Sequence, residues 1–262
     1  MIMLLLIVFG LVLGSFLNAL TWRLHEGRDW VRERSECPRC HRQLGPADLV
    51  PVFSWLLLRG KCRYCHKPIP DSPLVELVVP LLFVLSYIYW PVPLQGQGLF
   101  DFVCWLVFVV GFVALSVYDL RWFLLPDKIV FPLAGLAVVQ VLADALLFRH
   151  DWQLLGGPLI GVVIISGLFY ALYFLSKGTW IGFGDVKLGI ILGLLAGGAV
   201  KSVLVLLTAS LLGTLIAVPL LLQGKANRKT HLPFGPLLLA GMIIIGLWGT
   251  PLVTWYTGLF TV

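Results

Sequence analysis

The chain has 262 residues, of which 59% are hydrophobic and 12% are charged, and its mean hydropathy is +0.96. Soluble domains carry about 25% charged residues, so this composition excludes an ordinary soluble protein and indicates a membrane protein. The net charge of +6 does not indicate nucleic-acid binding, because the basic residues follow the predicted membrane surface and form no separate arm.

Apolar stretches recur from Met1 to the C-terminus, and they are too long and too many for a cleaved signal peptide. A membrane-spanning helix needs about 20 mainly apolar residues. Gly197, Gly198 and Lys201 supply the only break between the sixth and seventh stretches, so these two could also form one kinked segment. The predicted spans are residues 2–22, 74–91, 101–118, 129–148, 155–175, 187–200, 202–222 and 236–255.

The positive residues predict how these spans are oriented. Lys and Arg near helix ends are retained on the cytoplasmic side of the membrane. Seventeen of the 19 Lys and Arg residues fall in the segments 23–72, 119–128, 176–187 and 223–235, and only Arg149 and Lys201 fall between the other spans. We therefore expect a multi-pass protein of the inner (cytoplasmic) membrane with these four segments in the cytoplasm and both termini in the periplasm.

The segment 25–72 is the only one that is large and polar enough to fold in water. It carries two CxxC pairs, Cys37–Cys40 and Cys62–Cys65, a spacing that is typical of four thiolates closing a tetrahedral shell around a structural zinc ion. Two disulfides are the alternative, but cytoplasmic thiols stay reduced, which favours zinc. His41 and His66 are interpreted as surface residues, and Cys104 as a buried packing residue.

Acidic residues within or beside spanning helices are costly and therefore functional candidates. Asp101 and Asp144 lie near the outer face without a motif around them, and we interpret them as interfacial residues. Asp119 ends the third span and Asp185 opens the sixth, both at the cytoplasmic face. Gly182 and Gly184 precede Asp185 and permit a tight backbone turn into the next helix. The full set is Glu76, Asp101, Asp119, Asp127, Asp144 and Asp185.

Asp119 and Asp185 would form a catalytic pair if the bundle brings them together. Two aspartates in a partly desolvated site share a proton, so one can act as general base and the other as general acid in peptide hydrolysis. The alternative is that each caps a helix or pairs with Arg121 or Lys187 at the interface. The spacing alone supports both interpretations equally.

Several motifs in chain order resemble those of the type IV prepilin peptidases. They are Gly14-Ser15-Phe16-Leu17-Asn18, Trp22-Arg23-Leu24, the two CxxC pairs, Ser54-Trp55-Leu56, Pro73-Leu74-Val75-Glu76, Asp119-Leu120-Arg121, Leu125-Pro126-Asp127, Gly182-Phe183-Gly184-Asp185-Val186-Lys187 and Leu232-Pro233-Phe234-Gly235-Pro236. This resemblance implies a GxGD-type aspartic peptidase that cleaves prepilins and pseudopilins after a glycine at the cytoplasmic membrane face. The family's catalytic aspartates correspond to Asp119 and Asp185, and Gly182 and Gly184 form the turn beside them.

Many members of this family also methylate the new N-terminus with S-adenosylmethionine. The sequence contains no GxGxxG fingerprint of a soluble methyltransferase, so it does not locate a binding site for this cofactor. The expected architecture is an all-α polytopic membrane protein of about eight transmembrane helices with a small cytoplasmic zinc-knuckle loop domain. Its expected parts are a first helix (1–24), the loop domain (25–72) and a seven-helix bundle with the peptidase site (73–262).

Four residues outside these sites have competing interpretations. Gly14 and Asn18 indicate either close helix packing or substrate contact. Glu76 is predicted to hold an arginine of the loop, or else to line the substrate path. Lys187 either tunes the aspartate pair or extends to the cytoplasmic surface of the membrane, and the second interpretation is favoured.

The expected partners are prepilin and pseudopilin substrates and the lipid bilayer, without nucleic acid. A zinc-gated transporter or channel that passes protons or cations through Asp119 and Asp185 is the main alternative. A catalytically silent scaffold of a secretion system is another. The ordered set of motifs favours the peptidase over both.

Overall fold

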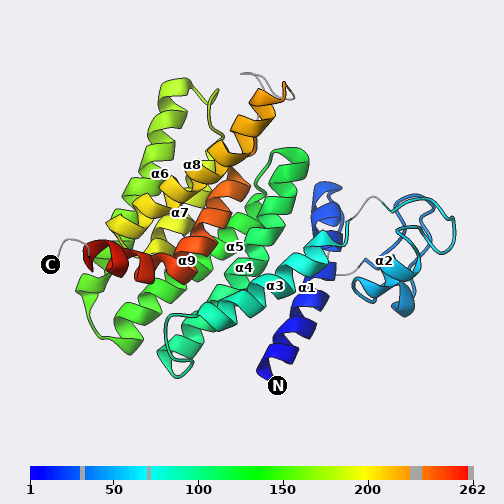
Figure 1. Cartoon of the computed structure of the whole chain (residues 1–262), viewed down its shortest axis with the longest axis horizontal. Helices are drawn as coiled ribbons and strands as arrows, with labels where there is room; N and C mark the ends of the chain where they lie inside the picture. Colours follow the sequence, from blue (N-terminus) through cyan, green and yellow to red (C-terminus); the bar gives the residue numbers. More distant parts are fainter. Residues whose placement is uncertain (30–32, 70–71, 225–231, 259–262) are drawn as a thin grey trace. The chain divides into compact units, whose positions relative to one another are not determined.

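The computed structural model describes residues 1–29, 33–69, 72–224 and 232–258, and these residues are mainly helical (Figure 1). Parts of the predicted cytoplasmic segments 25–72 and 223–235 therefore lie outside the described residues, including Arg32, Lys225, Arg228 and Lys229. The chain divides into two compact units, Met1–Ile88 and Tyr89–Val262.

Two helices of the first unit, α1 (Ile2–His25) and α3 (Leu74–Tyr89), pack closely through small residues. A methyl group added at Gly10 would lie 2.5 Å from the Cα atom of Pro80, and one added at Gly14 would lie 2.7 Å from the Cα atom of Glu76. Gly10 and Gly14 are one helical turn apart, so they form the small-xxx-small stripe that lets two backbones approach in a membrane. The packing interpretation of Gly14 is therefore confirmed.

Between α1 and α3 the chain forms a loop module with little regular structure. It contains a short 3₁₀ turn, η1 (Pro46–Asp48), and a short helix, α2 (Phe53–Leu57). Two isolated antiparallel bridges, Glu36 with Gln43 and Lys61 with Pro68, each close a small loop around one cysteine pair. So small a module buries little apolar surface, which is why it needs an additional staple.

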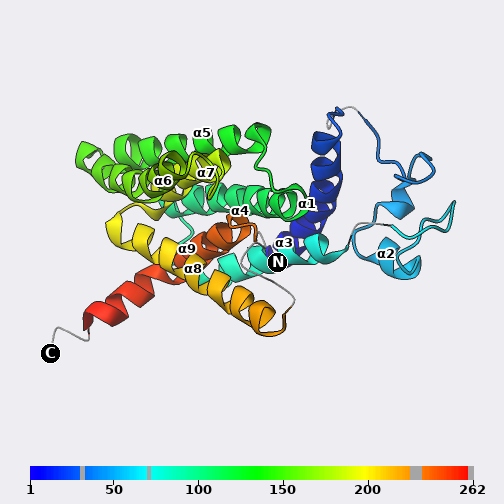
Figure 2. The same ribbon diagram turned by 90° about the horizontal axis from the view of Figure 1, so that it is seen from above.

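The second unit begins with α4 (Gln97–Trp122) and α5 (Asp127–Ala143), which continues through the π-helical turn η2 (Asp144–Phe148). The 3₁₀ turn η3 (Trp152–Leu155) leads into α6 (Gly156–Ser176). They are followed by α7 (Phe183–Ala196), α8 (Ala199–Leu222) and α9 (Gly235–Gly258). In Figure 2, α8 and α9 lie on one side of the layer that contains α5, α6 and α7.

The short helix α7 occupies the centre of this unit, where it contacts α5, α6, α8 and α9. Its side chains Leu188, Ile191 and Leu192 are fully buried. It packs most closely on α6, because a methyl group added at Gly193 would lie 2.5 Å from the Cα atom of Val162. The beginning of α7 is therefore held by packing on several sides, which fixes the position of the GFGD segment.

All eight predicted spans correspond to helices, and six helices of the described part of the chain are long and apolar enough to cross a bilayer. The other two, α3 with 16 residues and α7 with 14, are shorter. At 1.5 Å per residue they extend about 24 and 21 Å, less than the roughly 30 Å of a bilayer core. The prediction of an all-α polytopic membrane protein is confirmed, and α7 and α8 are separate helices because Gly197 and Gly198 divide them.

Candidate functional site

Asp119 lies in the last turn of α4 and is buried, with 7% of its surface exposed. Its carboxylate accepts a hydrogen bond from the backbone N–H of Gly235, the first residue of α9. A methyl group added at Gly235 would lie 2.6 Å from the Oδ2 atom of Asp119, so a larger residue here would displace this carboxylate. The N-terminus of α9 thus provides the partner that a buried carboxylate needs.

Asp185 lies in the first turn of α7 and is partly buried. Its carboxylate accepts from the backbone N–H of Gly182, the N-cap of the helix, while its own N–H donates to the Gly182 carbonyl over 3.1 Å. Gly182 has an ordinary extended conformation, with φ −75° and ψ 151°. Gly184 lies against Leu125, because an added methyl group would be 3.2 Å from its Cβ. The glycine pair therefore serves to let the backbone at Gly184 approach the side chain of Leu125 closely.

The structure brings Asp119 and Asp185 into one site. The two carboxyl groups are near enough for their charges to interact. Leu125 connects their surroundings, since its side chain contacts Gly184 and lies 3.7 Å from a methyl group added at Gly235. The ends of α4, α7 and α9 thus meet here, although their motifs are distant in the sequence. Two carboxyl groups in one such site can share a proton and act as a general acid and a general base.

An ion pair beside this site was not predicted from the sequence. Lys187 Nζ lies 2.6 Å from Asp127 Oδ1 and joins the beginning of α7 to the beginning of α5. The same ammonium lies 5.4 Å from the ring centroids of Phe131 and Phe183. Lys187 thus forms a bridge between two helices, and its extension to the membrane surface stays a prediction. The opposite charges at two helix starts were the only sequence signal for this pair.

The four predicted zinc ligands also come together, in the first unit. The sulfur atoms of Cys37, Cys40, Cys62 and Cys65 all lie within 4.8 Å of one another, and each of these cysteines is free. A zinc ion bound tetrahedrally at about 2.3 Å from each sulfur separates the sulfurs by roughly 3.8 Å. The 3.9 Å between the sulfurs of Cys37 and Cys65 agrees with that value. The cluster can hold zinc, and the alternative of two disulfides does not describe this arrangement.

Both cysteine knuckles have the same backbone geometry. In each, the N–H of the first cysteine donates across the loop, to Arg42 in one knuckle and to Lys67 in the other. The residue after the second cysteine, His41 or His66, has a positive φ and is exposed, in agreement with its interpretation as a surface residue.

Cys37 is prepared to bind a metal as a thiolate. Burial disfavours its ionisation, but hydrogen bonds from the backbone N–H groups of Arg39 and Cys40 and from the neighbouring thiols outweigh burial. Together they lower the pKa of the Cys37 thiol to about 7.

Asp101 and Asp144 join α4 and α5 through hydrogen bonds. The Gln140 side chain donates to Asp101 over 2.9 Å, and Asp144 accepts from Gln97 and pairs with Arg149 at 3.2 Å. These bonds are compatible with the interfacial role predicted for Asp101 and Asp144. Cys104 is buried in α4, as predicted.

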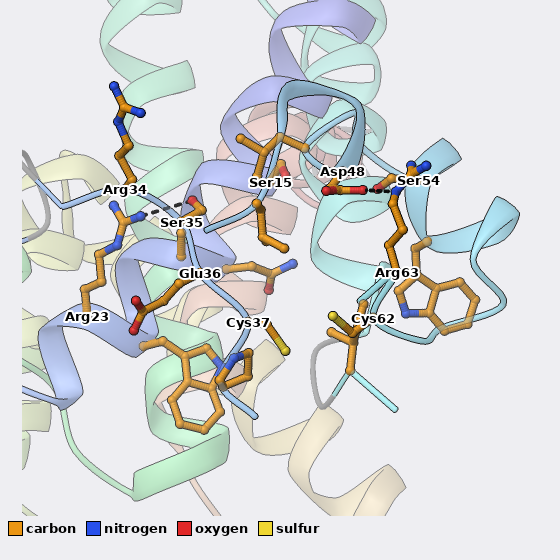
Figure 3. A pocket seen from close by; sticks show the side chains of 18 of the residues that line it. Ser15, Arg23, Arg34, Ser35, Glu36, Cys37, Asp48, Ser54, Cys62 and Arg63 are labelled. Atoms are coloured by element: carbon orange, nitrogen blue, oxygen red, sulfur yellow. Dashed lines mark hydrogen bonds and ion pairs between the residues drawn. The ribbon is translucent and has the colours of Figure 1, made fainter. Parts of the chain in front are cut away.

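A cavity of about 230 Å³ opens in the first unit between α1, the loop module and the start of α3 (Figure 3). Glu76 lies at this cavity and accepts a 2.6 Å hydrogen bond from the backbone N–H of Val52. Among the residues that the structure describes, Glu76 holds the loop through this backbone N–H and forms no ion pair with an arginine, which corrects the favoured prediction. Val52 has φ 62°, which is strained for a β-branched residue, so this bond stabilises an unfavourable backbone conformation. Sequence patterns do not reveal this strained turn.

Fold and site define a polytopic membrane protein with two aspartates at converging helix ends and a four-cysteine module. Comparison with known protein families agrees with this description of the fold and the site. Residues 8–90 match the Bacterial Peptidase A24 N-terminal domain, and residues 106–218 match the Type IV leader peptidase family. The chain belongs to the type IV leader peptidase family and is therefore a peptidase.

Relatives cover nearly the whole chain. The Prepilin leader peptidase/N-methyltransferase of Stutzerimonas stutzeri is 32% identical over 95% of this chain and 92% of its own length. The proteins of the same name from Aeromonas hydrophila and Bacillus subtilis (strain 168) are 32% and 30% identical, over 96% of this chain and 92% and 96% of their own lengths. No solved structure matches the chain. A multi-pass protein of the inner membrane fits these relatives and the six apolar helices.

Proposed function

We propose that this protein is an aspartic endopeptidase that removes the leader of prepilins and pseudopilins after a glycine, at the cytoplasmic face of the membrane. The observation that carries the proposal is the convergence of Asp119 and Asp185 around Leu125 at three helix ends. Relatives of this chain are named prepilin leader peptidases, and these names support the choice of substrate.

In this proposal the two carboxyl groups share one proton. The ionised carboxylate takes a proton from water as the water oxygen bonds to the scissile carbonyl carbon. The protonated carboxyl donates to the carbonyl oxygen, and a proton passes to the amine nitrogen as the C–N bond breaks. The N–H groups of Gly235 and Gly182 hold the two carboxyls in place throughout. Either aspartate alone would lack one half of this cycle.

We propose further that the protein methylates the new N-terminus, as the names of its relatives indicate. S-adenosylmethionine would supply the methyl group when bound, leaving its C–S bonding electrons on sulfur while the amine lone pair forms the new C–N bond. A structural zinc ion on Cys37, Cys40, Cys62 and Cys65 would hold the loop module together. The loop module and the peptidase site would both face the cytoplasm, with the two termini in the periplasm.

The test is to incubate the purified protein in detergent with a prepilin, with and without S-adenosylmethionine, and to measure the mass of the products. We expect the mass of the mature subunit without the cofactor, and an increase of one methyl group with it. An intact substrate after prolonged incubation with folded protein would contradict the peptidase proposal. A cleaved but unmethylated product would contradict only the methylation step.

A further inference from the structure

The short helix α2 of the loop module carries an apolar face that no other part of the described chain covers. Phe53, Leu56 and Leu57 lie on one side of this helix, at the spacing i, i+3, i+4, and 63%, 58% and 83% of their surfaces are exposed. Val50, just before the helix, is exposed as well. We call these four residues the outer face of α2. A contiguous exposed apolar patch in an otherwise polar segment marks an interaction surface.

The opposite side of α2 is held against the loop module. Ser54, Trp55 and Leu58 line the cavity described above. Gly60 packs on the indole ring of Trp55, since a methyl group added at Gly60 would lie 2.9 Å from that ring. The helix is thus attached to the module by one side. Its outer face cannot turn inward without breaking these contacts, so it stays available to a partner.

Contacts with α3 and α1 place α2 at the boundary of the membrane. The backbone N–H of Val52, the N-cap of α2, donates to Glu76 in the first turn of α3. The cavity that Trp55 lines is bounded on another side by Ser15 and Asn18 of α1, a helix long and apolar enough to cross a bilayer. The helix α2 therefore lies at the level where α3 begins and beside the second half of α1.

The residues that follow α2 are basic. Residues 49–69 include Arg59, Lys61, Arg63 and Lys67 and contain no Asp or Glu. Arg63 pairs with Asp48, whereas Arg59, Lys61 and Lys67 are exposed and form no ion pair with a residue that the structure describes. An apolar helix face flanked by Lys and Arg is typical of a segment that lies in the headgroup region of a membrane with anionic lipids.

We infer that the outer face of α2 inserts into the interfacial region of the bilayer and seats the loop module on anionic phospholipids. The leaflet is the one at which α1 ends and α3 begins. Because these two helices tether the module to that leaflet, α2 meets lipid at a high effective concentration, and a helix of this length is enough. Arg59 and Lys61 reach the lipid phosphate groups. The inference goes beyond cleavage and methylation and does not depend on either.

The test places the fluorescent amino acid dansylalanine at position 57 of the full-length protein, in vesicles of phosphatidylcholine and phosphatidylglycerol. Lipids with brominated acyl chains quench a fluorophore that lies among those chains. We expect quenching at least about twofold stronger than with the same label at Gln43, an exposed polar residue of the first knuckle. Emission as in water, without quenching, at position 57 would overturn the inference. Equal quenching at the two positions would overturn the assignment to the outer face of α2.

A double variant tests the apolar side chains themselves. With the label in place of Phe53, Leu56→Gln combined with Leu57→Gln should lower the quenching at least about twofold. Leu175→Gln, the same change at an exposed leucine of the second unit, should leave it unchanged. Unchanged quenching in a double variant that keeps its metal would overturn the inference. If the double variant loses its metal, the label at position 57 of the parent sequence decides.

The charges and the competing partners are tested by varying the vesicles. Arg59→Gln combined with Lys61→Gln should reduce quenching at position 57 in vesicles with phosphatidylglycerol and have little effect in phosphatidylcholine alone. Equal quenching of parent and variant in both would overturn the role of anionic lipid. Shielding of the label only at a high ratio of protein to lipid would overturn the inference and assign the face to a second copy of the chain. Shielding only after addition of a prepilin would overturn it in favour of a protein partner.

Discussion

At the scale of single residues, the candidate peptidase site depends on backbone groups that no sequence motif displays. Asp119 and Asp185 were predicted as a pair from their places at helix ends, and the structure brings them into one site. The N–H of Gly235 that holds Asp119 comes from a helix more than 100 residues away, so only the fold reveals it. The ion pair between Lys187 and Asp127 was not predicted, because hydropathy patterns do not indicate which opposite charges meet.

The ion pair between Lys187 and Asp127 predicts that Lys187 is not a catalytic residue. The pair is partly exposed, and such pairs contribute about 0–1 kcal/mol to stability. We expect Lys187→Gln to lower the thermal midpoint in detergent by only a few degrees and to retain cleavage within about tenfold. A thermal-shift assay and a cleavage time course measure both. Loss of all cleavage in a variant with an unchanged midpoint would assign Lys187 to the catalytic machinery instead.

At the scale of the elements, the sequence predicted where helices form but not how long each is or what surrounds it. The spans were placed from apolar windows, and a central helix such as α7 is apolar because other helices cover it. The GFGD segment at the beginning of α7 was predicted to form a tight, close-approaching turn into the helix, and Gly182 is an extended N-cap. The need for glycine arises from the contact between Gly184 and Leu125, which is a tertiary feature.

The contact between α6 and α7 can be tested with one methyl group. In Gly193→Ala the added methyl would lie 2.5 Å from the Val162 Cα atom, and the helices would have to separate. Overpacking of this kind costs about 1–3 kcal/mol, so we expect a lower thermal midpoint and weaker cleavage. Gly135→Ala is the matched control, since nothing lies within 4 Å of its added methyl and alanine favours the helix. Equal midpoints for the two variants would contradict the close packing.

The cysteine module provides a second test at this scale. We expect the purified protein to contain close to one equivalent of zinc, and Cys62→Ser to lose most of it because a tetrahedral shell would lack one thiolate. Cys104→Ser changes a buried cysteine of α4 and should keep the metal. Elemental analysis of the three proteins measures this. Full zinc content in Cys62→Ser would show that the four sulfurs do not form the site.

At the scale of the whole molecule, the described helices and the distribution of positive charge together predict one topology. The two compact units were not evident from the sequence, in which α3 reads as one more span of the bundle. The hydropathy of a helix does not show whether its apolar side chains contact lipid or other helices. The packing of α3 on Gly10 and Gly14 groups it with α1, and the spacing of these two glycines does not indicate which helix they contact.

The orientation of the protein in the membrane is tested with reporter fusions. The loop at His150 is predicted to be periplasmic and the turn at Gly178 cytoplasmic, because Lys and Arg concentrate in the segments on the latter face. Alkaline phosphatase, which is active only outside the cytoplasm, should therefore be active when fused after His150 and inactive when fused after Gly178. The reverse pattern would invert the proposed topology and place the aspartates on the periplasmic side.

The central claim is that Asp119 and Asp185 act together on one water molecule. The most direct measurement is the rate of leader cleavage by Asp119→Asn and Asp185→Asn, each purified with its zinc content and thermal midpoint checked. Each substitution keeps the shape of the side chain and removes a group that can exchange the shared proton. We expect each to reduce cleavage by at least about a thousandfold, near the limit for losing general acid–base catalysis. Cleavage within a few-fold of the parent in either folded variant would contradict the claim.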